Sequence, residues 1–500
     1  MADEAGIALD DLGIEAQASA PLSAGDAELH AMLEQRKLAH QVPVPTSDVQ
    51  VRERLRQYDE PITLFGEREP DRRARLLQVL IARHGKNAVH LSHAPSAEAE
   101  ADDDDEEFYT EGSDDLLVAR RRIAMDSLSR AKERRAYQSR EARVPMQDVA
   151  QLRKQVLEPL RSYQLLGSQI AGSRPISMVR FAPNASILAT GSWSGQAALW
   201  SLPNATPRGA ALTGHEDRVS GLAWHPRATL SQSTNAVNLA TGAGDGAVCL
   251  WSLDDERPLL RTLRGHEARV CRTAFHPMGD YLASASFDGT WRLWDIERGL
   301  ELLLQEGHSR EVYAIDVHTD GSLVASGGLD AIGRLWDTRT GRTAMVLDGH
   351  AREILGMAFA PNGYHLLSAS GDDTVRVWDL RTLSTLYTIP AHRSSVADVR
   401  FFTAANERPR APAPWWADTA DSMEVDEREE ADTPALRRSG LYFATAGYDG
   451  LVKLWSADDW QLIHTLRGDS GKVMSVDISS DGQYIASGEW GRTFKLWGSL

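Results

Sequence analysis

The stretch from residue 266 to residue 294, HEARVCRTAFHPMGDYLASASFDGTWRLW, decides the fold because its pattern recurs along the chain. It runs from a histidine to a tryptophan 28 residues later, and the pairs His308–Trp336 and His350–Trp378 have the same spacing. Seven tryptophans close such segments: Trp200, Trp251, Trp294, Trp336, Trp378, Trp455 and Trp497. A period of about 40–45 residues, with Gly-His early and Trp-Asp late, predicts the four-stranded blades of a β-propeller.

Within each repeat, apolar residues alternate with small or polar ones, as in the YLASAS stretch from Tyr281, and a turn follows at Asp288-Gly289. A period of two residues predicts strands. The repeats are similar to those of the WD40 family. We therefore expect an all-β fold, a seven-bladed propeller over residues 162–500, preceded by a largely helical or disordered arm. The last repeat lacks its fourth strand, which residues 161–170 are expected to supply, so that the ring closes without a free edge.

The WD40 resemblance implies that one histidine, one serine, one turn aspartate and one tryptophan form a hydrogen-bonded brace in each blade. These residues are His266, Ser284, Asp288 and Trp294, then His308, Ser326, Asp330 and Trp336, then His350, Ser368, Asp372 and Trp378. A single copy would resemble a hydrolase triad, but recurrence in successive repeats favours a structural role. The chain has no Gly-Lys-Ser/Thr phosphate loop or His-Glu-x-x-His motif, and its two cysteines lack metal-ligand spacing. We expect no catalytic residues, cofactor, metal or small-molecule substrate.

The first and last repeats depart from the brace, because Ser194 and Gly491 stand where the turn aspartate should be. Each is preceded by a tryptophan, and the sixth repeat has a tyrosine at that position. The candidate partner-binding residues are Trp193, Trp490, Tyr448, Lys472 and Arg492. Aromatic and basic side chains suit a protein partner or a stacked base. Alternatively, bulky turn residues merely cap degenerate blades.

Two insertions lengthen the repeats, at residues 227–235 and at about 403–439. Both fall between the first and second strands, so they should protrude from the face opposite the histidine loops. The longer one is rich in proline and acidic residues, which predicts a disordered loop. Its Trp415-Trp416 pair is either a partner-docking hook or folds back onto the blade.

Residues 1–161 carry no such repeat. Their composition predicts an acidic disordered N-terminus (1–42), a helical hairpin (43–90), an acidic linker (91–119) and a basic helical segment (120–161). The linker has 11 acidic residues and no basic ones, whereas the basic segment has 12 Lys and Arg against five acidic residues. The formal net charge of −17 therefore conceals a segment that could contact phosphate.

The hairpin contains the most specific motif, VPTSDVQVRERLRQYDEPITLFGE at residues 44–67, followed by an arginine-rich helix. It resembles the splicing-factor motif of the WD40 subunit of the U4/U6 small nuclear ribonucleoprotein, the pre-mRNA-processing factor four family. Tyr58-Asp59 stands where that family more often has a hydrophobic-Gly pair. The motif residues are Val51, Leu55, Tyr58, Pro61, Leu64, Phe65, Arg72 and Arg73.

The resemblance implies a nuclear, non-enzymatic scaffold of the U4/U6 particle and the larger tri-snRNP. It also implies partners of the factor-three type, a cyclophilin, and direct or indirect contact with U4/U6 RNA. No apolar run approaches the length that a membrane helix needs, so we expect no membrane partner. RNA or ribonucleoprotein contact is assigned to Arg120, Arg121, Arg122, Lys132, Arg134 and Arg135. The alternative is a solvated helix against the acidic linker.

A rival interpretation is a substrate adaptor of a cullin ubiquitin ligase. The sequences Trp336-Asp-Thr-Arg339 and Trp378-Asp-Leu-Arg381 fit the Trp-Asp-x-Arg motif of some propeller adaptors. The same residues also stand where ordinary blades end their third strand. Co-purification of RNA would separate the two interpretations.

Overall fold

The computed structural model describes residues 48–58, 60–61, 69–84, 112–254, 256–404, 436–468 and 471–499. The chain forms two compact units, residues 1–104 and 105–500, and each is considered by itself. In these described ranges, no helix combines the length and apolar character that crossing a bilayer requires.

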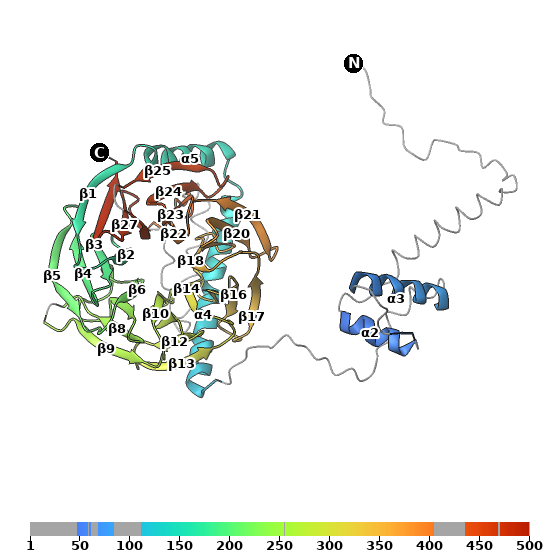
Figure 1. Ribbon diagram of the computed structural model, residues 1–500. Helices are drawn as coiled ribbons and strands as arrows, with labels where there is room; N and C mark the ends of the chain where they lie inside the picture. The colour runs from blue at the N-terminus through green and yellow to red at the C-terminus, as the bar shows by residue number, and fades with distance from the viewer. Residues whose placement is uncertain are drawn as a thin grey trace, which may run out of the picture. The chain divides into compact units, whose positions relative to one another are not determined.

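The second unit contains seven four-stranded antiparallel sheets, which confirms the predicted seven-bladed propeller (Figure 1). Blade one has β2 (Ile176–Phe181), β3 (Ile187–Ser192), β4 (Gln196–Ser201) and β5 (Thr206–Thr213), blade two β6 (Val219–Trp224), β7 (Leu239–Ala243), β8 (Ala247–Trp251) and β9 (Leu259–Arg264), and blade three β10 (Val270–Phe275), β11 (Tyr281–Ser286), β12 (Trp291–Asp295) and β13 (Leu300–Gln305). Blade four has β14 (Val312–Val317), β15 (Leu323–Gly328), β16 (Gly333–Asp337) and β17 (Thr343–Leu347), and blade five β18 (Ile354–Phe359), β19 (His365–Ser370), β20 (Thr374–Asp379) and β21 (Ser384–Pro390). Blade six has β22 (Val396–Phe401), β23 (Tyr442–Gly447), β24 (Leu451–Ser456) and β25 (Leu462–Arg467), and blade seven β26 (Val473–Ile478), β27 (Tyr484–Glu489), β28 (Thr493–Gly498) and β1 (Gln164–Ile170).

The ring closes through β1, the first strand of the unit in sequence. It pairs antiparallel with β28, the last strand, with Leu165 opposite Trp497 and Ile170 opposite Thr493. This confirms that residues ahead of blade one supply the fourth strand of blade seven. The closure leaves no radial seam of unpaired backbone groups between the first and last blades.

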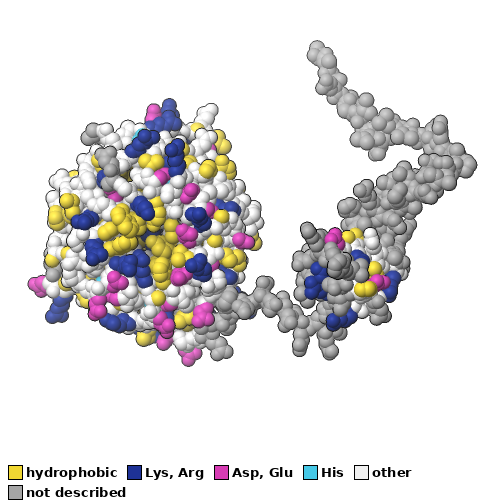
Figure 2. All heavy atoms as spheres, in the orientation of Figure 1, with side chains coloured by type: hydrophobic (Ala, Val, Ile, Leu, Met, Phe, Trp, Pro, Cys, Tyr) yellow, Lys and Arg dark blue, Asp and Glu magenta, His cyan; other side chains and the backbone are white. Residues whose placement is uncertain are grey.

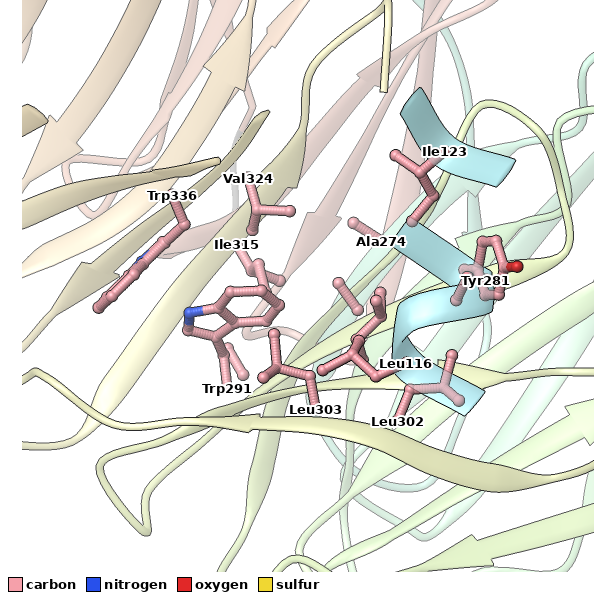
Figure 3. Packing of buried hydrophobic residues seen from close by; sticks show 14 of the residues in the cluster. Leu116, Ile123, Ala274, Tyr281, Trp291, Leu302, Leu303, Ile315, Val324 and Trp336 are labelled. Atoms are coloured by element: carbon pink, nitrogen blue, oxygen red, sulfur yellow. The ribbon is translucent and has the colours of Figure 1, made fainter. Parts of the chain in front are cut away.

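Helix α4 (Asp114–Glu141) packs against the propeller, and α5 (Met146–Leu160) follows it (Figure 1). Leu116 and Ile123 of α4 are fully buried in a cluster with residues of blades three and four, including Trp291 (Figure 3). Farther along, Arg134 forms an ion pair with Asp320, with Nη2 2.6 Å from Oδ2. The helix begins within the segment assigned by sequence to the acidic linker. Its buried face lies on the propeller.

The first unit contains a helical hairpin, α2 (Asp48–Gln57) and α3 (Glu69–His84). Val51 and Leu55 of α2 and Leu76 and Leu80 of α3 are buried against one another. Tyr58 packs partly against this cluster, and of the motif arginines, Arg72 is buried while Arg73 is exposed. The motif therefore forms a small core of its own, while Leu64 and Phe65 lie outside the described residues.

A second set of histidines, not recognised in the sequence, joins neighbouring blades. In blade three, Nε2 of His276 donates to the backbone oxygen of Gly321 in blade four (2.9 Å), and Nδ1 accepts from the backbone N–H of Met278 (3.2 Å). His318 bonds to the backbone oxygen of Gly363 in the same way (3.0 Å). Both imidazoles are almost fully buried. An Nδ1 that accepts a backbone hydrogen bond holds the imidazole of His276 in its neutral form.

These histidines predict a stability that falls in mild acid. His225 has the equivalent place after β6 in blade two and forms a hydrogen bond with the backbone of Gly279. Burial lowers the pKa of both His225 and His276 to about 4, from an ordinary value near 6.5. Because the folded pKa lies below the unfolded one, protonation favours unfolding, so stability is lost as the pH falls from about 6.5 to about 4. We expect the urea midpoint to be level from pH 8 to 7 and to decline below 6.5. The decline should be shallower in His276→Gln, and a flat midpoint from pH 7 to 4.5 would contradict this assignment.

Candidate functional site

The brace histidines lie at one end of the blades, beside the turn aspartates. In blade three, His266 Nδ1 lies 2.7 Å from Asp288 Oδ2, Nε2 lies 2.7 Å from Ser284 Oγ, and Trp294 Nε1 donates to the same hydroxyl (2.8 Å). The corresponding residues of blades four and five have the same arrangement, and blades two and six add His215–Thr241–Asp245–Trp251 and His392–Thr445–Asp449–Trp455. Burial favours a raised pKa for the Asp288 carboxyl, but hydrogen bonds from His266 and Thr290 outweigh it, so this pKa is lowered. In each of these blades, the brace holds the histidine loop against the turn that carries the aspartate.

At the brace end of the propeller, each blade pairs one turn residue with the residue that precedes its first strand; we call these seven pairs the mouth ring. In each pair, the backbone N–H of the turn residue donates to the carbonyl of the residue that precedes the first strand, at 2.8–3.0 Å. The pairs are Trp193–Pro175, Gly244–Arg218, Phe287–Arg269, Leu329–Glu311, Gly371–Glu353, Tyr448–Ser395 and Trp490–Lys472. Four of the seven turn residues are therefore aromatic. In Figure 2, hydrophobic side chains gather near the middle of the propeller face, with Lys and Arg around them.

The structure brings the predicted aromatic and basic residues together in blades six, seven and one. The rings of Trp193 and Trp490 meet edge to face, with centroids 4.8 Å apart and planes at 77°. Lys472 Nζ lies 5.1 Å from the ring centre of Tyr448 and 5.9 Å from that of Trp490. Arg492 is exposed in the same turn as Trp490, which is itself 45% exposed.

The mouth ring continues into blades two and three through residues that the sequence analysis missed. The guanidinium of Arg218 lies 5.5 Å from the ring centre of Trp193, and that of Arg269 lies 5.6 Å from that of Phe287. Phe287 in turn contacts Tyr313, with centroids 6.2 Å apart. Comparing the equivalent position in every repeat would have found these residues. Glu311 and Glu353 precede the first strands of blades four and five, where Arg218 and Arg269 stand in blades two and three. The mouth ring therefore has a basic side and an acidic side.

At the centre of the propeller, arginines and aspartates of the first strands of the blades form a buried ionic network. Asp398 Oδ2 accepts from Arg180 Nη1 and Nη2 (3.0 Å each) and from Ser475 Oγ (2.8 Å), and Arg272 lies 3.9 Å from Oδ1. Burial alone would raise the pKa of Asp398, but Arg180, Arg272 and Arg400 outweigh burial and hold it at about 2. Burial lowers the pKa of Arg180 to about 10. The network joins blades one, three, six and seven beneath the mouth ring.

The remaining predicted residues fall into separate groups. On α4, Arg134 and half-buried Arg120 face the propeller, and exposed Arg122 reaches Tyr281 of blade three. Arg121, Lys132 and Arg135 are exposed. Arg134 therefore makes a contact within the chain, because its guanidinium donates a hydrogen bond to the Asp320 carboxylate. Trp415 and Trp416 lie outside the described residues. In the described part of the chain, no cluster of His, Cys, Asp and Glu is placed to hold a metal ion.

The arginines of the two Trp-Asp-x-Arg sequences bind within their own turns. Arg339 Nη2 lies 3.0 Å from Asp337 Oδ2, and Arg381 Nη2 lies 2.7 Å from Asp379 Oδ2. The guanidinium of Arg381 also covers the ring of Tyr364, 4.1 Å from its centre. These local contacts account for both arginines without an outside partner.

Comparison with known proteins agrees with the two-part organisation. A family model described as pre-mRNA processing factor 4 (PRP4) like matches residues 51–79, which span the hairpin. The model of the WD domain, G-beta repeat matches residues 164–201, 207–252, 257–295, 301–337, 341–379 and 460–498. The segment between the last two matches is the one that carries the long insertion in blade six.

Several curated proteins are similar to the chain. U4/U6 small nuclear ribonucleoprotein PRP4 of Saccharomyces cerevisiae is 39% identical over 462 residues, covering 91% of this chain and 90% of the relative. An uncharacterized WD repeat-containing protein of Schizosaccharomyces pombe is 45% identical over 250 residues, and U4/U6 small nuclear ribonucleoprotein Prp4 of Homo sapiens is 40% identical over 212. These two alignments span 52% and 40% of the relatives' lengths. The alignment with the yeast protein extends over the hairpin and the propeller together, and the chain therefore belongs to the PRP4 family of U4/U6 small nuclear ribonucleoprotein proteins.

Proposed function

We propose that this chain is a non-catalytic scaffold subunit of the spliceosomal U4/U6 particle and the U4/U6.U5 tri-snRNP, acting in pre-mRNA splicing in the nucleus. The observation that carries the proposal is the aromatic and basic mouth ring, held on a closed propeller in a chain of the PRP4 family. The Ser, His and Asp side chains recur as a brace in successive blades, which supports a structural use for them. Family membership favours this function over the cullin adaptor.

The chemistry of the mouth ring favours a protein segment that carries carboxylates over a stacked base. Lys472 covers the faces of Tyr448 and Trp490, and Arg218 covers that of Trp193. A stacked base would need those faces free. Ring edges and cation N–H groups remain for a partner, and both attract negative charge.

The partners of the proposed scaffold are those of the particle. They are another U4/U6 protein of the factor-three type, a cyclophilin, further tri-snRNP proteins, and U4/U6 RNA bound directly or through proteins. The hairpin and the propeller are separate compact units, which supports their use as two attachment points. Neither unit requires a membrane or a small-molecule substrate for this role.

The hairpin provides the test of this function. Leu55→Asp places a charge in the small core formed with Leu76, because Leu55 is 0% exposed. A buried unpaired charge costs several kcal/mol, so the hairpin should unfold. We expect the variant to recover at least about tenfold less U4 and U6 RNA by affinity purification and RNA sequencing. The thermal unfolding of the propeller should not change.

The matched control is Arg56→Asp, an exposed position on the same helix, which should recover RNA as the wild type does. If the wild-type chain recovers no U4 or U6 RNA, the proposed function is wrong. If Leu55→Asp recovers as much RNA as the wild type while its hairpin is unfolded, the hairpin is not an attachment point.

A further inference from the structure

Helix α4 has two opposite faces, and only one of them is used within the chain. Its buried face carries Leu116, Ala119, Ile123, Arg130 and Tyr137. The opposite face exposes four large hydrophobic side chains, Leu117 (48%), Val118 (51%), Met125 (53%) and Leu128 (63%). Four such residues within 12 positions of one helix make an unusual concentration of exposed apolar surface, which typically marks an interaction site.

The exposed face has the spacing of a helix-packing seam. Positions 118, 121, 125, 128, 132 and 135 are separated alternately by three and four residues, as the a and d positions of a heptad are. We call these six residues the outer seam. Arg121, Lys132 and Arg135 complete it, and all three are exposed. The outer seam thus has apolar Met125 and Leu128 at its middle, cations on either side of them, and apolar Val118 at its N-terminal end.

The propeller holds this helix as a rigid platform. Leu116 and Ile123 are buried in the cluster of blades three and four, Arg134 is paired with Asp320, and Tyr137 Oη accepts from the backbone N–H of Arg437 (2.7 Å). Ser113 caps the helix by accepting from the backbone N–H of Leu116 (3.3 Å). The outer seam is therefore ordered before a partner arrives, which reduces the entropy lost on binding.

We propose that the outer seam of α4 docks an amphipathic helix of a protein partner, with apolar residues at heptad spacing and acidic residues beside them. Apolar side chains in the middle would cover Met125 and Leu128, and carboxylates would pair with Arg121, Lys132 and Arg135. None of these three cations pairs with another described residue. RNA would use the cations but would leave the apolar residues uncovered, so a helix fits the whole seam better. The outer seam is distinct from the mouth ring. Helix α4 packs on loops that follow the first strands of the blades, such as the loop of Asp320 between β14 and β15, and these loops lie at the end of the blades opposite the mouth ring.

The test is a photo-crosslink from the seam inside the assembled particle. A benzoylphenylalanine replaces Leu128 in the full chain, and mass spectrometry identifies the attached peptide. The expected product is one protein segment with apolar residues at heptad spacing and a net negative charge. A crosslink to RNA, to this chain or to a segment without that pattern overturns the proposal. So does the absence of a crosslink.

A pair of variants supplies the affinity measurement. Met125→Asp with Leu128→Asp should reduce retention of the crosslinked partner in the purified particle by at least about tenfold. Gln147→Asp with Gln151→Asp adds the same charges to exposed positions of α5 and should leave retention unchanged. Circular dichroism and thermal unfolding check that both proteins fold. If the two double variants retain the crosslinked partner equally, the outer seam is not its docking site. Recovery of U4 and U6 RNA by the same proteins would show that the proposed function still holds, so the two failures can be told apart.

Discussion

Replacing Asp398 with alanine is expected to lower the free energy of unfolding of the propeller by about 3–5 kcal/mol, because it breaks a buried ionic network. The carboxylate is 2% exposed and accepts two hydrogen bonds from Arg180, which is itself 5% exposed. Without it, the guanidinium groups of Arg180 and Arg272 remain buried with no carboxylate between them. Urea unfolding at pH 7, followed by tryptophan fluorescence, measures the loss.

Two comparisons make this prediction specific to the network. Asp398→Asn keeps the shape and one acceptor oxygen, so its loss should be smaller than that of the alanine variant. Asp217→Ala removes a carboxylate whose side chain is 53% exposed and should change stability by less than about 0.5 kcal/mol. If Asp398→Ala is no less stable than Asp217→Ala, the network does not stabilise the fold.

Replacing both Trp193 and Trp490 with alanine is expected to weaken the binding of the mouth-ring partner by about 100-fold or more, since aromatic anchors of interfaces each contribute about 2 kcal/mol or more. The two rings support each other edge to face and hold Arg218 and Lys472 in place. Loss of the two rings therefore removes apolar contact with the partner. It also leaves Arg218 and Lys472 without the rings that hold them in position to bind the partner's carboxylates. Co-purification of particle proteins, quantified by mass spectrometry, measures the loss.

The control for the tryptophan variant is Tyr387→Ala, which removes an aromatic side chain that is 50% exposed on β21, the outer strand of blade five. It should retain all partners. Thermal unfolding of both proteins shows whether the propeller persists, since Trp193 and Trp490 lie in turns and close no blade. Full retention of every partner by the folded double variant would rule out the mouth ring as a binding site.

The sequence predicts the propeller well, because its repeat places the same side chains at the same positions in every blade. The aromatic half of the mouth ring is also predictable, since Trp193 and Trp490 interrupt that pattern. Arg218 and Arg269 were missed because they are unremarkable until the ring brings each beside an aromatic turn residue. The docking of α4 was missed because its buried face includes Asp126 and Arg130, which pair with each other (2.6 Å) and hide the apolar stripe.

The pairing of β1 with β28 also sets the order in which the molecule can be assembled. Residues 164–170 leave the ribosome long before residues 493–498, yet the two strands form adjacent parts of one sheet. Until residues 493–498 emerge, β1 has no partner strand, and the ring of blades stays open between blade one and blade seven. Contacts this distant in sequence slow folding and prolong the exposure of unpaired edges. The nascent chain should therefore depend on chaperones until β28 has emerged, and deletion of residues 493–498 should leave an open ring prone to aggregation.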